Sequence, residues 1–455
     1  MLTRLCARAF SILCTSLLLS AQASAQPAAP ARPVSSSDLD TLRDELSRLR
    51  DEVAALRSEL AEVKRGTPAQ EQAAQQPAQV TPEALEVLKA QIEEQSQTKV
   101  ESSSRMPVKI TGAIVTNAYV NSGEAIWLEN PTLVGAPPAS GAPTGSASLT
   151  ARQSRIGLQT SGIMIGGWQA SGEIIADFYA GVPNFQTGTV MGLPRLLYAF
   201  GRIENDRTAF EIGQDHAILA PRDPTSLAAF AFPLLFRSGN LYLRVPQARV
   251  EQKLGSNWTL SGGVIAPIAG DAGATFEFAP PPGAGERSKR PAFEARIGYA
   301  RGDRDAASEI QAGLSGHYGW RRLGTELVDS WAVAVDANAR VGRIGAAGEY
   351  FTADNAQPFG GAISQIGRSS GGWAEGRFSV TSRALLTGGF GIDHPTDAVG
   401  RLLRSDNRSA FSSVIFDLTP EISASVEYRW LRTRLGLVPV SRENHHVNAV
   451  FAVKF

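Results

Sequence analysis

Cysteine, histidine and long apolar runs are all scarce in this chain. Its 455 residues include two cysteines and five histidines. Both cysteines, Cys6 and Cys14, precede a predicted cleavage site, so the exported protein is predicted to carry no thiol. No later stretch approaches the roughly 20 apolar residues of a transmembrane helix. These shortages argue against a disulfide-stapled scaffold, a zinc domain and a helical membrane protein.

Residues 1–25 have the pattern of a secretory signal peptide. Arg4 and Arg8 supply positive charge, residues 9–19 a short apolar core, and residues 23–25 a small-residue cleavage site. Cleavage removes two of the 44 basic residues and leaves 44 acidic ones, a net charge near −2. This balance gives no sign of a nucleic-acid partner.

Residues 37–65 are predicted to form a coiled coil. Apolar residues recur at alternating steps of three and four over four heptads, the period of a coiled-coil seam. These predicted oligomerisation residues are Leu39, Leu42, Leu46, Leu49, Val53, Leu56, Leu60 and Val63. Acidic residues fill the g positions and basic residues the e positions, so parallel copies attract one another. The alternative is a solvated helix lying on its own domain.

Less regular segments flank the coiled coil. Residues 26–36 are predicted to be flexible, residues 66–80 form a linker rich in Pro, Gln and Ala, and residues 81–96 form a short helix. From residue 107 the apolar period changes from that of a helix to that of a strand and stays so to residue 455. The remainder is therefore predicted to be all β.

This all-β region, residues 107–455, is predicted to be a transmembrane barrel of about 16 antiparallel strands. The predicted strands lie near 107–121, 149–161, 166–180, 193–204, 207–214, 239–253, 257–266, 291–301, 307–318, 329–341, 343–353, 371–381, 384–393, 408–418, 420–433 and 443–455. Their connections alternate between long and short, as in a barrel inserted from one side of a membrane. A soluble β-sandwich or propeller is the alternative.

The last strand shows what such a barrel requires of each strand. Val447, Phe451 and Phe455 fall on one face, and His446 and Asn448 on the other, because successive side chains of a strand point to opposite sides. One face is predicted to contact lipid and the other a wet interior. This strand is also predicted to pair with the first one, near residues 109–120, and so to close the ring.

Charges of both signs fall on the faces predicted to line the interior, and a water-filled lumen tolerates them where a packed core does not. The candidates for pore lining and constriction are Arg155, Glu173, Asp177, Asp215, His216, Arg222, Asp223, Arg237, Arg244, Arg249, Arg296, Glu375, Arg377, Glu427 and Arg429. The alternative is that many of them pair across the wall. The apolar segment 215–238 is predicted to fold into the barrel and narrow the channel, or to latch onto a neighbouring subunit.

Chemical motifs give no positive signal. The chain lacks a phosphate-binding glycine loop, a zinc-type spacing and a Gly-x-Ser-x-Gly elbow, so no metal and no cofactor are predicted. A surface hydrolase built from Asp393, His394 and a loop serine stays open as a minor alternative.

Four stretches resemble the DcaP-like trimeric porins of Gram-negative outer membranes. They are ARQSRIGLQTSG (151–162), GEIIADF (172–178), IGQDHAILAP (212–221) and LRVPQARV (243–250). The resemblance implies a coiled coil joined to a sixteen-stranded barrel, a homotrimer, and passage of small, often anionic solutes such as dicarboxylates. Arg155, Arg244 and Arg249 lie in these stretches and suit such solutes. Phe455 resembles the carboxy-terminal aromatic signature of outer-membrane barrels, which implies recognition by the barrel assembly machinery.

The sequence thus predicts a porin for passive diffusion in the Gram-negative outer membrane, and not an enzyme. Its coiled coil is expected in the periplasm, within reach of peptidoglycan, and its barrel among outer-membrane lipid and lipopolysaccharide. A structural or adhesive protein that uses the barrel only as an anchor is the main alternative, and the surface hydrolase is a weaker one.

Overall fold

The computed structural model describes residues 108–181, 192–267, 282–302, 308–360, 367–397, 401, 404–436 and 440–455. The segments predicted within residues 1–96, including the coiled coil, lie outside this part of the chain and stay predictions. Among the described residues, no helix has the length and apolar character needed to cross a membrane.

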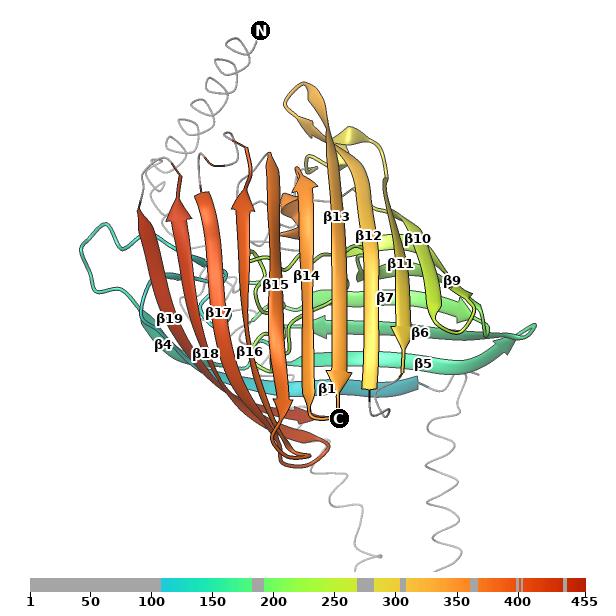
Figure 1. Ribbon diagram of the computed structural model, residues 1–455, viewed down its shortest axis with the longest axis horizontal. Coiled ribbons are helices and arrows are strands. Elements are labelled where there is room, and N and C mark those ends of the chain that lie inside the picture. The colour runs from blue at the N-terminus through green and yellow to red at the C-terminus, as the bar shows by residue number, and fades with distance from the viewer. Residues whose placement is uncertain are drawn as a thin grey trace, which may run out of the picture. The chain divides into compact units, whose positions relative to one another are not determined.

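The described strands form one large sheet and one small hairpin (Figure 1). The large sheet contains β1 (Val108–Asn121), β4 (Ser146–Thr150), β5 (Arg155–Ile165), β6 (Trp168–Asp177), β7 (Arg195–Glu204), β8 (Thr208–His216), β9 (Arg244–Leu254), β10 (Trp258–Ile265), β11 (Ala292–Arg301), β12 (Ser308–Leu323), β13 (Glu326–Val341), β14 (Ile344–Asp354), β15 (Arg368–Ser379), β16 (Ala384–Pro395), β17 (Arg404–Asp417), β18 (Ile422–Leu435) and β19 (Ser441–Lys454). The hairpin is β2 (Ala125–Ile126) with β3 (Leu133–Val134), and the short 3-10 helices are η2 (Glu286–Ser288) and η3 (Gln357–Phe359).

The large sheet closes on itself. Each strand pairs antiparallel with the next, and β19 pairs with β1, where Ala113 lies opposite Lys454 and Asn121 opposite His446. Beyond β19, Gly112 and Phe455 exchange two backbone hydrogen bonds, of 2.9 and 3.1 Å. Of the seventeen described segments, β4 and β5 follow one another along the same edge of β1, so the ring has sixteen positions. The predicted barrel and its predicted closure are confirmed.

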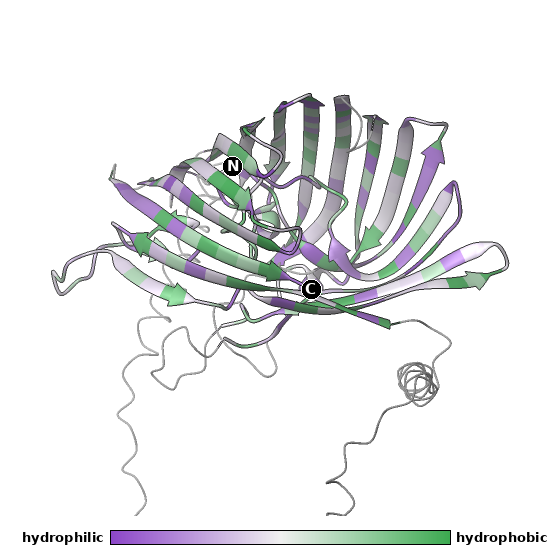
Figure 2. Cartoon of the chain, turned by 90° about the horizontal axis from the view of Figure 1, so that it is seen from below, coloured by the Kyte–Doolittle hydropathy of each residue, from purple (hydrophilic) through white to green (hydrophobic). Residues whose placement is uncertain are grey.

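Side chains alternate between the two faces of the ring, and Figure 2 shows hydrophobic and hydrophilic residues interspersed along its strands. On β19, Val447 and Phe451 are 44% and 48% exposed, whereas His446 and Asn448 are 2% and 0% exposed. Exposed large apolar side chains occur on every strand of the ring, mainly on the face that the last strand shows to be outward, while the adjacent Met164 and Ile165 at the turn end of β5 are both exposed. Because water-soluble proteins rarely expose apolar patches of this extent, the outer surface requires an apolar environment.

The connections differ between the two ends of the ring. The end that carries Val108 and Lys454, here called the turn end, has tight connections such as Gly166-Gly167, where both glycines have positive φ angles of 55° and 86° as a two-residue hairpin needs. The opposite end, here called the loop end, carries the long connections, including residues 217–243 between β8 and β9.

One connection departs from the predicted alternation. The strands predicted at 307–318 and 329–341 continue to Leu323 and start at Glu326, so that Gly324 and Thr325 alone join β12 to β13 at the loop end (Figure 1). The expectation of a long connection there is wrong, because both strands extend past the ring as a paired ribbon. The backbone N–H and C=O groups of these residues are hydrogen-bonded between the two strands, so the residues do not form a loop.

Candidate functional site

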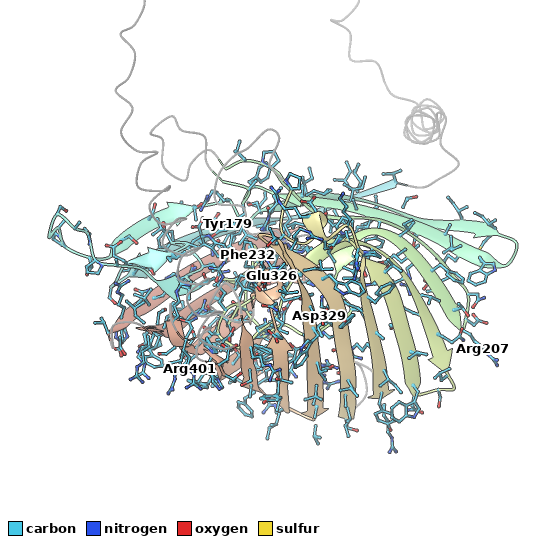
Figure 3. The ribbon with its side chains drawn as sticks, turned by 90° about the horizontal axis from the view of Figure 1, so that it is seen from above. Tyr179, Arg207, Phe232, Glu326, Asp329 and Arg401 are labelled. Carbon is cyan, nitrogen blue, oxygen red and sulfur yellow. The ribbon has the colours of Figure 1, made fainter. Side chains whose placement is uncertain are left out.

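The connection of residues 217–243, here called the lumenal loop, folds into the ring. Its apolar side chains pack against inward side chains on opposite walls: Leu227 lies in a cluster with Val115 of β1, and Leu235 in a cluster with Trp373 of β15. Phe232 is 2% exposed, and Figure 3 shows it with Tyr179 inside the ring, while Arg207 and Arg401 lie at its periphery. The loop therefore spans the lumen, as predicted for segment 215–238.

Carboxylates on one side of the ring hold the backbone of the lumenal loop. Glu294 on β11 accepts hydrogen bonds from the N–H groups of Ile218 and Leu219, at 2.6 and 2.9 Å. Glu349 on β14 accepts one from the N–H of Arg222 at 2.8 Å. Glu375 on β15 and Glu427 on β18 continue the series: they accept from the N–H of residue 225 at 2.8 Å and from the hydroxyl of residue 226 at 2.6 Å. Charge-assisted bonds of this kind are roughly twice as strong as neutral ones.

Amide side chains from two parts of the wall also hold the lumenal loop. Gln153, fully buried just before β5, donates to the carbonyl of Ala228 at 2.8 Å and accepts from the N–H groups of Phe230 and Ala231, both at 2.8 Å. Asn407 on β17 donates to the carbonyl of Arg237 at 2.7 Å. The loop is thus fixed at both sides of the ring by groups that match its backbone polarity.

The middle of the lumenal loop carries backbone strain. Leu235 and Arg237 both have φ angles of 64°, a left-handed conformation that costs about 1–2 kcal/mol for a residue with a Cβ. Gly239, at φ 98°, passes so close to Gly372 on β15 that a Cβ would collide with its carbonyl group. The surrounding packing therefore imposes this conformation, as is common at functional sites.

The connection between β1 and β4 also enters the ring beside the lumenal loop. Trp127 stacks on Phe232 with ring centroids 4.3 Å apart. Glu129, whose side chain is fully buried, forms an ion pair of 2.6 Å with Arg152. Asn130 donates to the carbonyl of Phe232 at 2.7 Å. Two connections from the loop end therefore occupy the lumen together.

A basic and aromatic cluster lies where the lumenal loop meets β5, β7, β8 and β9. The Arg244 guanidinium lies 5.0 Å from the centre of the Tyr198 ring and 4.7 Å from that of Tyr242. The Tyr198 hydroxyl and His216 Nε2 are 2.7 Å apart. Arg155 donates to the carbonyl of residue 230 and is close enough to Arg244 for mutual repulsion. Two arginines kept together favour an anion nearby.

Asp223 of the lumenal loop faces this cluster. Burial raises the pKa of its carboxyl to about 6, although a hydrogen bond from Asn240 and the charges of Arg244 and Arg155 act against the rise. Burial likewise lowers the pKa of Arg237, and the charge of Arg404 lowers it further. The loop therefore carries a carboxyl group whose charge changes close to neutral pH.

Most of the other charged residues predicted to line the pore form ion pairs within the wall. Asp336 on β13 pairs with Arg296 at 2.7 Å and also with Arg222 of the lumenal loop. Toward the turn end, Arg249 pairs with Glu211 at 3.0 Å and with Asp215 at 2.8 Å. A lumen whose arginines face carboxylates in this way presents less net charge than the residue count suggests.

The predicted lining residues therefore divide by their contacts. Four of them hold the two inserted connections: Arg222, Glu375, Glu427 and Arg429. Four belong to the basic and aromatic cluster or face it: Arg155, His216, Asp223 and Arg244. Six are bonded to other side chains of the wall, namely Glu173, Asp177, Asp215, Arg249, Arg296 and Arg377, and Arg237 lies over the rings of Trp127 and Phe236. The alternative of pairing across the wall thus describes a large share of them.

Sequence reasoning missed the uncharged anchors and the aromatic partners. Gln153, Asn130 and Asn407 bond the loops, and Tyr198 and Tyr242 flank Arg244. The residues predicted to line or narrow the pore were Asp, Glu, Arg and His side chains alone, so these amides and tyrosines were not among them. The sequence signal that could have identified them is an uncharged polar side chain at an inward position, such as Gln153 in the stretch 151–162.

Among the described residues, Asp393 and His394 do not form the acid–histidine pair of the predicted hydrolase. His394 Nε2 lies 3.3 Å from the Ser370 hydroxyl, but the adjacent Asp393 points to the other face of β16 and is 1% exposed. A triad needs an acid that orients the histidine. The described residues also include no group of His, Cys, Asp or Glu side chains suited to a metal ion.

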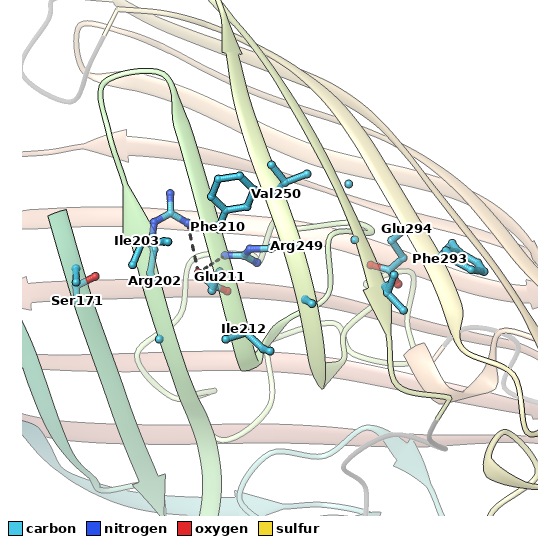
Figure 4. Close-up of a pocket in the computed structure, with 16 residues that line it drawn as sticks. Ser171, Arg202, Ile203, Phe210, Glu211, Ile212, Arg249, Val250, Phe293 and Glu294 are labelled. Carbon is cyan, nitrogen blue, oxygen red and sulfur yellow. Dashed lines mark hydrogen bonds and ion pairs between the residues drawn. The ribbon is translucent and has the colours of Figure 1, made fainter. Parts of the chain in front are cut away.

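A hollow of about 850 Å³ lies on the outer side of β6 to β11 (Figure 4). Its rim includes the exposed side chains of Phe210, Ile212 and Val250. Behind the wall, Arg202 and Arg249 bond Glu211 at 3.3 and 3.0 Å. This hollow faces away from the lumen and is distinct from the basic and aromatic cluster.

These features define a class of protein: the chain has the sixteen-stranded antiparallel closed barrel of outer-membrane channels. The outer-membrane channel DcaP of Acinetobacter baumannii has this fold, with a TM-score of 0.59 over 78% of this chain and 99% of that one, at 16% identity. The anion-selective porin from Comamonas acidovorans has it too, with a TM-score of 0.53 over 77% and 100%, at 12% identity. No family model and no curated protein matches the sequence. The predicted resemblance to DcaP-like channels is confirmed for the fold.

Proposed function

We propose that this protein is an outer-membrane porin through which small hydrophilic solutes diffuse passively, with a preference for small anions of the dicarboxylate type. One observation carries the proposal: the ring is apolar on its outside and lined by charged and amide side chains on its inside, the reverse of a soluble protein. The lumenal loop narrows the interior, so size and charge at that level select the solutes.

Aromatic side chains near both ends of the ring support a position in a membrane. Trp258, at the turn end of β10, is 47% exposed and packs edge to face on Tyr299 with ring centroids 5.1 Å apart. Near the loop end, Tyr318 and Trp320 pack in the same manner at 5.0 Å. Tyrosine and tryptophan are enriched where hydrocarbon meets headgroups. The apolar belt between these pairs is the proposed contact with lipid.

The basic and aromatic cluster supports the preference for anions. Arg155 and Arg244 lie together, and the aromatic rings of Tyr198 and Tyr242 hold the second of them in place. The porin of Comamonas acidovorans, which has the same fold, is described as anion-selective. An anion that passes this level gains favourable interaction with both guanidinium groups.

The assembly is part of the proposal. The heptads of residues 37–65 support association of identical chains, and the resemblance to DcaP-like trimeric porins supports three of them, with the coiled coil in the periplasm in reach of peptidoglycan. Phe455, paired with Gly112 at the closing seam, is the proposed signal for the barrel assembly machinery. Outer-membrane lipid and lipopolysaccharide are the proposed surroundings of the belt.

Planar-bilayer recording of the purified full chain tests the proposal. Stepwise conductance increases are expected, and a salt gradient should give a reversal potential of the sign for anion preference. Matched variants sharpen the test: Arg155→Gln and Arg244→Gln should move the reversal potential toward zero, whereas Arg207→Gln, in an exposed turn, should not. Absence of conductance would instead favour the barrel-anchored structural or adhesive protein, and cation preference would refute the selectivity.

A further inference from the structure

A second polar site lies on the outer side of the ring, at the loop end of β16, β17 and β18. Here a pocket of about 510 Å³ is lined by Ile392, His394, Arg401, Ser405, Arg408 and Arg434, together with Pro395, Asp406, Leu435 and Gly436. None of these residues belongs to the lumenal cluster described above.

The pocket opens beside the apolar belt. Residues two apart on a strand share a face, so Ile392 and His394 point to the same side as Phe390, which is 44% exposed. By the same rule Arg408 shares its face with Ala410, which lies opposite Phe390 in the ladder of β16 and β17. The polar pocket therefore stands directly above apolar side chains, at the end of the strands.

The charge in and beside the pocket is mainly positive. Arg408 lies opposite Arg432 in the β17–β18 ladder, with both on the outward face. Like charges directly opposite in a sheet are destabilising. Among the residues lining the pocket, Asp406 alone is acidic, and it pairs with Arg408 at 2.9 Å while Arg434 adds a further exposed charge. Asp406 also lies opposite Arg434 in this ladder, and Glu443 of β19 lies opposite Arg432, so these acids offset part of the positive charge. Three arginines line the pocket against this one aspartate, and an anionic ligand would balance the excess.

We propose that this pocket binds the phosphate group of a membrane glycolipid in the leaflet at the loop end. Guanidinium groups bind phosphate through paired hydrogen bonds, and Arg408 and Arg434 supply two of them. Ile392 and Phe390 below the pocket receive the acyl chains, which a free phosphate does not have. Basic groups beside an apolar surface are the general means of lipid headgroup recognition. The inference rests on the proposed position in a membrane.

The test measures binding of three probes to the delipidated full chain in detergent by native mass spectrometry. The probes are lipid A with two phosphates, the same lipid without phosphate, and inorganic phosphate. Lipid A should bind at least about tenfold more tightly than the other two, the loss expected for one charge-assisted hydrogen bond. The double variant R408Q/R434Q should lose this difference, and R207Q/R301Q, with the same loss of charge at the turn end, should keep it.

Each other result overturns the assignment. Equal binding of both lipids removes the role of phosphate, and equal binding of inorganic phosphate removes the lipid. Equal loss in both double variants means a general charge effect. If R408Q/R434Q does not fold, R408K/R434K keeps the charge and should retain preference for lipid A while binding it more weakly. Conductance of the same samples separates the two proposals, since R408Q/R434Q faces outward and should leave conductance unchanged.

Discussion

Replacement of Gln153 by alanine should release the lumenal loop without opening the ring. This side chain makes three hydrogen bonds, all to the loop backbone and all of 2.8 Å, to residues 228, 230 and 231. It is fully buried, so no water replaces it without rearrangement. The change removes these three hydrogen bonds, while the bonds from Arg155 and Arg195 to the loop carbonyls and the carboxylate attachments elsewhere on the wall remain.

The free energy by which Gln153 stabilises the docked loop can be worked out from those three hydrogen bonds. A net contribution of about 1 kcal/mol for each, and a further penalty for backbone groups left buried without a partner, gives about 3–5 kcal/mol for docking of this part of the loop. At 1.4 kcal/mol for each factor of ten, the open population should rise by roughly a hundredfold to a thousandfold. Melting of the ring itself should change little, because none of the three bonds joins two strands.

Hydrogen exchange of the residue 230 and 231 amides measures this opening, and single-channel recording should show added current noise. Gln159→Ala is the matched control: Gln159, a few residues further along, bonds only the Glu173 carboxylate, at 2.8 Å, from one strand to the next. Unchanged exchange in Gln153→Ala, or equal acceleration in Gln159→Ala, would refute the claim that Gln153 holds the loop.

Three further predictions concern charge and closure. Burial raises the Asp223 pKa from 3.8 to about 6, so the charged carboxylate destabilises the fold above pH 6, and this destabilisation disappears as pH falls from 6 to 4. The anion preference of the channel should rise over the same pH range, because the negative charge is lost. Asp223→Asn should abolish the pH dependence of both the reversal potential and the melting temperature. Gly112→Ala should reduce the free energy of unfolding by about 1–3 kcal/mol, and so lower the melting temperature, because the added Cβ would lie 2.5 Å from the Phe455 ring. Gly376→Ala, whose Cβ would meet open space, should leave the melting temperature unchanged. Arg244→Gln should reduce inhibition of the current by a test dicarboxylate, measured as the concentration for half block, and an unchanged value would contradict a role for this side chain in anion passage.

Much of the ring could be predicted from the sequence because each strand has its own alternation of apolar and polar residues. Alternation on β19 places Phe451 outward and Asn448 inward irrespective of the neighbours. The tight join at Gly324 was beyond such reasoning, because residues 319–328 continue the strand pattern and only the pairing of β12 with β13 shows that they form a ribbon. Local periodicity predicts strands, while the length of a connection depends on where pairing stops.

The interior was less predictable, because a charge on an inward face has several uses. Glu427 was expected to line a pore and instead accepts a hydrogen bond from the loop hydroxyl of Ser226 at 2.6 Å. The apolar character of segment 215–238 did indicate an inserted loop, since its phenylalanines need cover. Which wall residues meet it depends on the path of the loop through space, and no local pattern encodes that path.

Donors and acceptors on the walls of the lumen both contact the backbone of the lumenal loop. Glu294, on the β11 side, accepts hydrogen bonds from loop N–H groups, whereas Arg155 and Arg195, on the β5 to β7 side, donate to loop carbonyls, the second at 2.8 Å. Buried charges are tolerated when such bonds satisfy them. Glu294, Glu349 and Glu375 are thereby occupied in holding the loop, and Asp223 of the loop is an acidic group that faces Arg155 and Arg244. The proposed preference for anions therefore depends on how the loop is held and on the charge of Asp223, because the chain as a whole has no net charge.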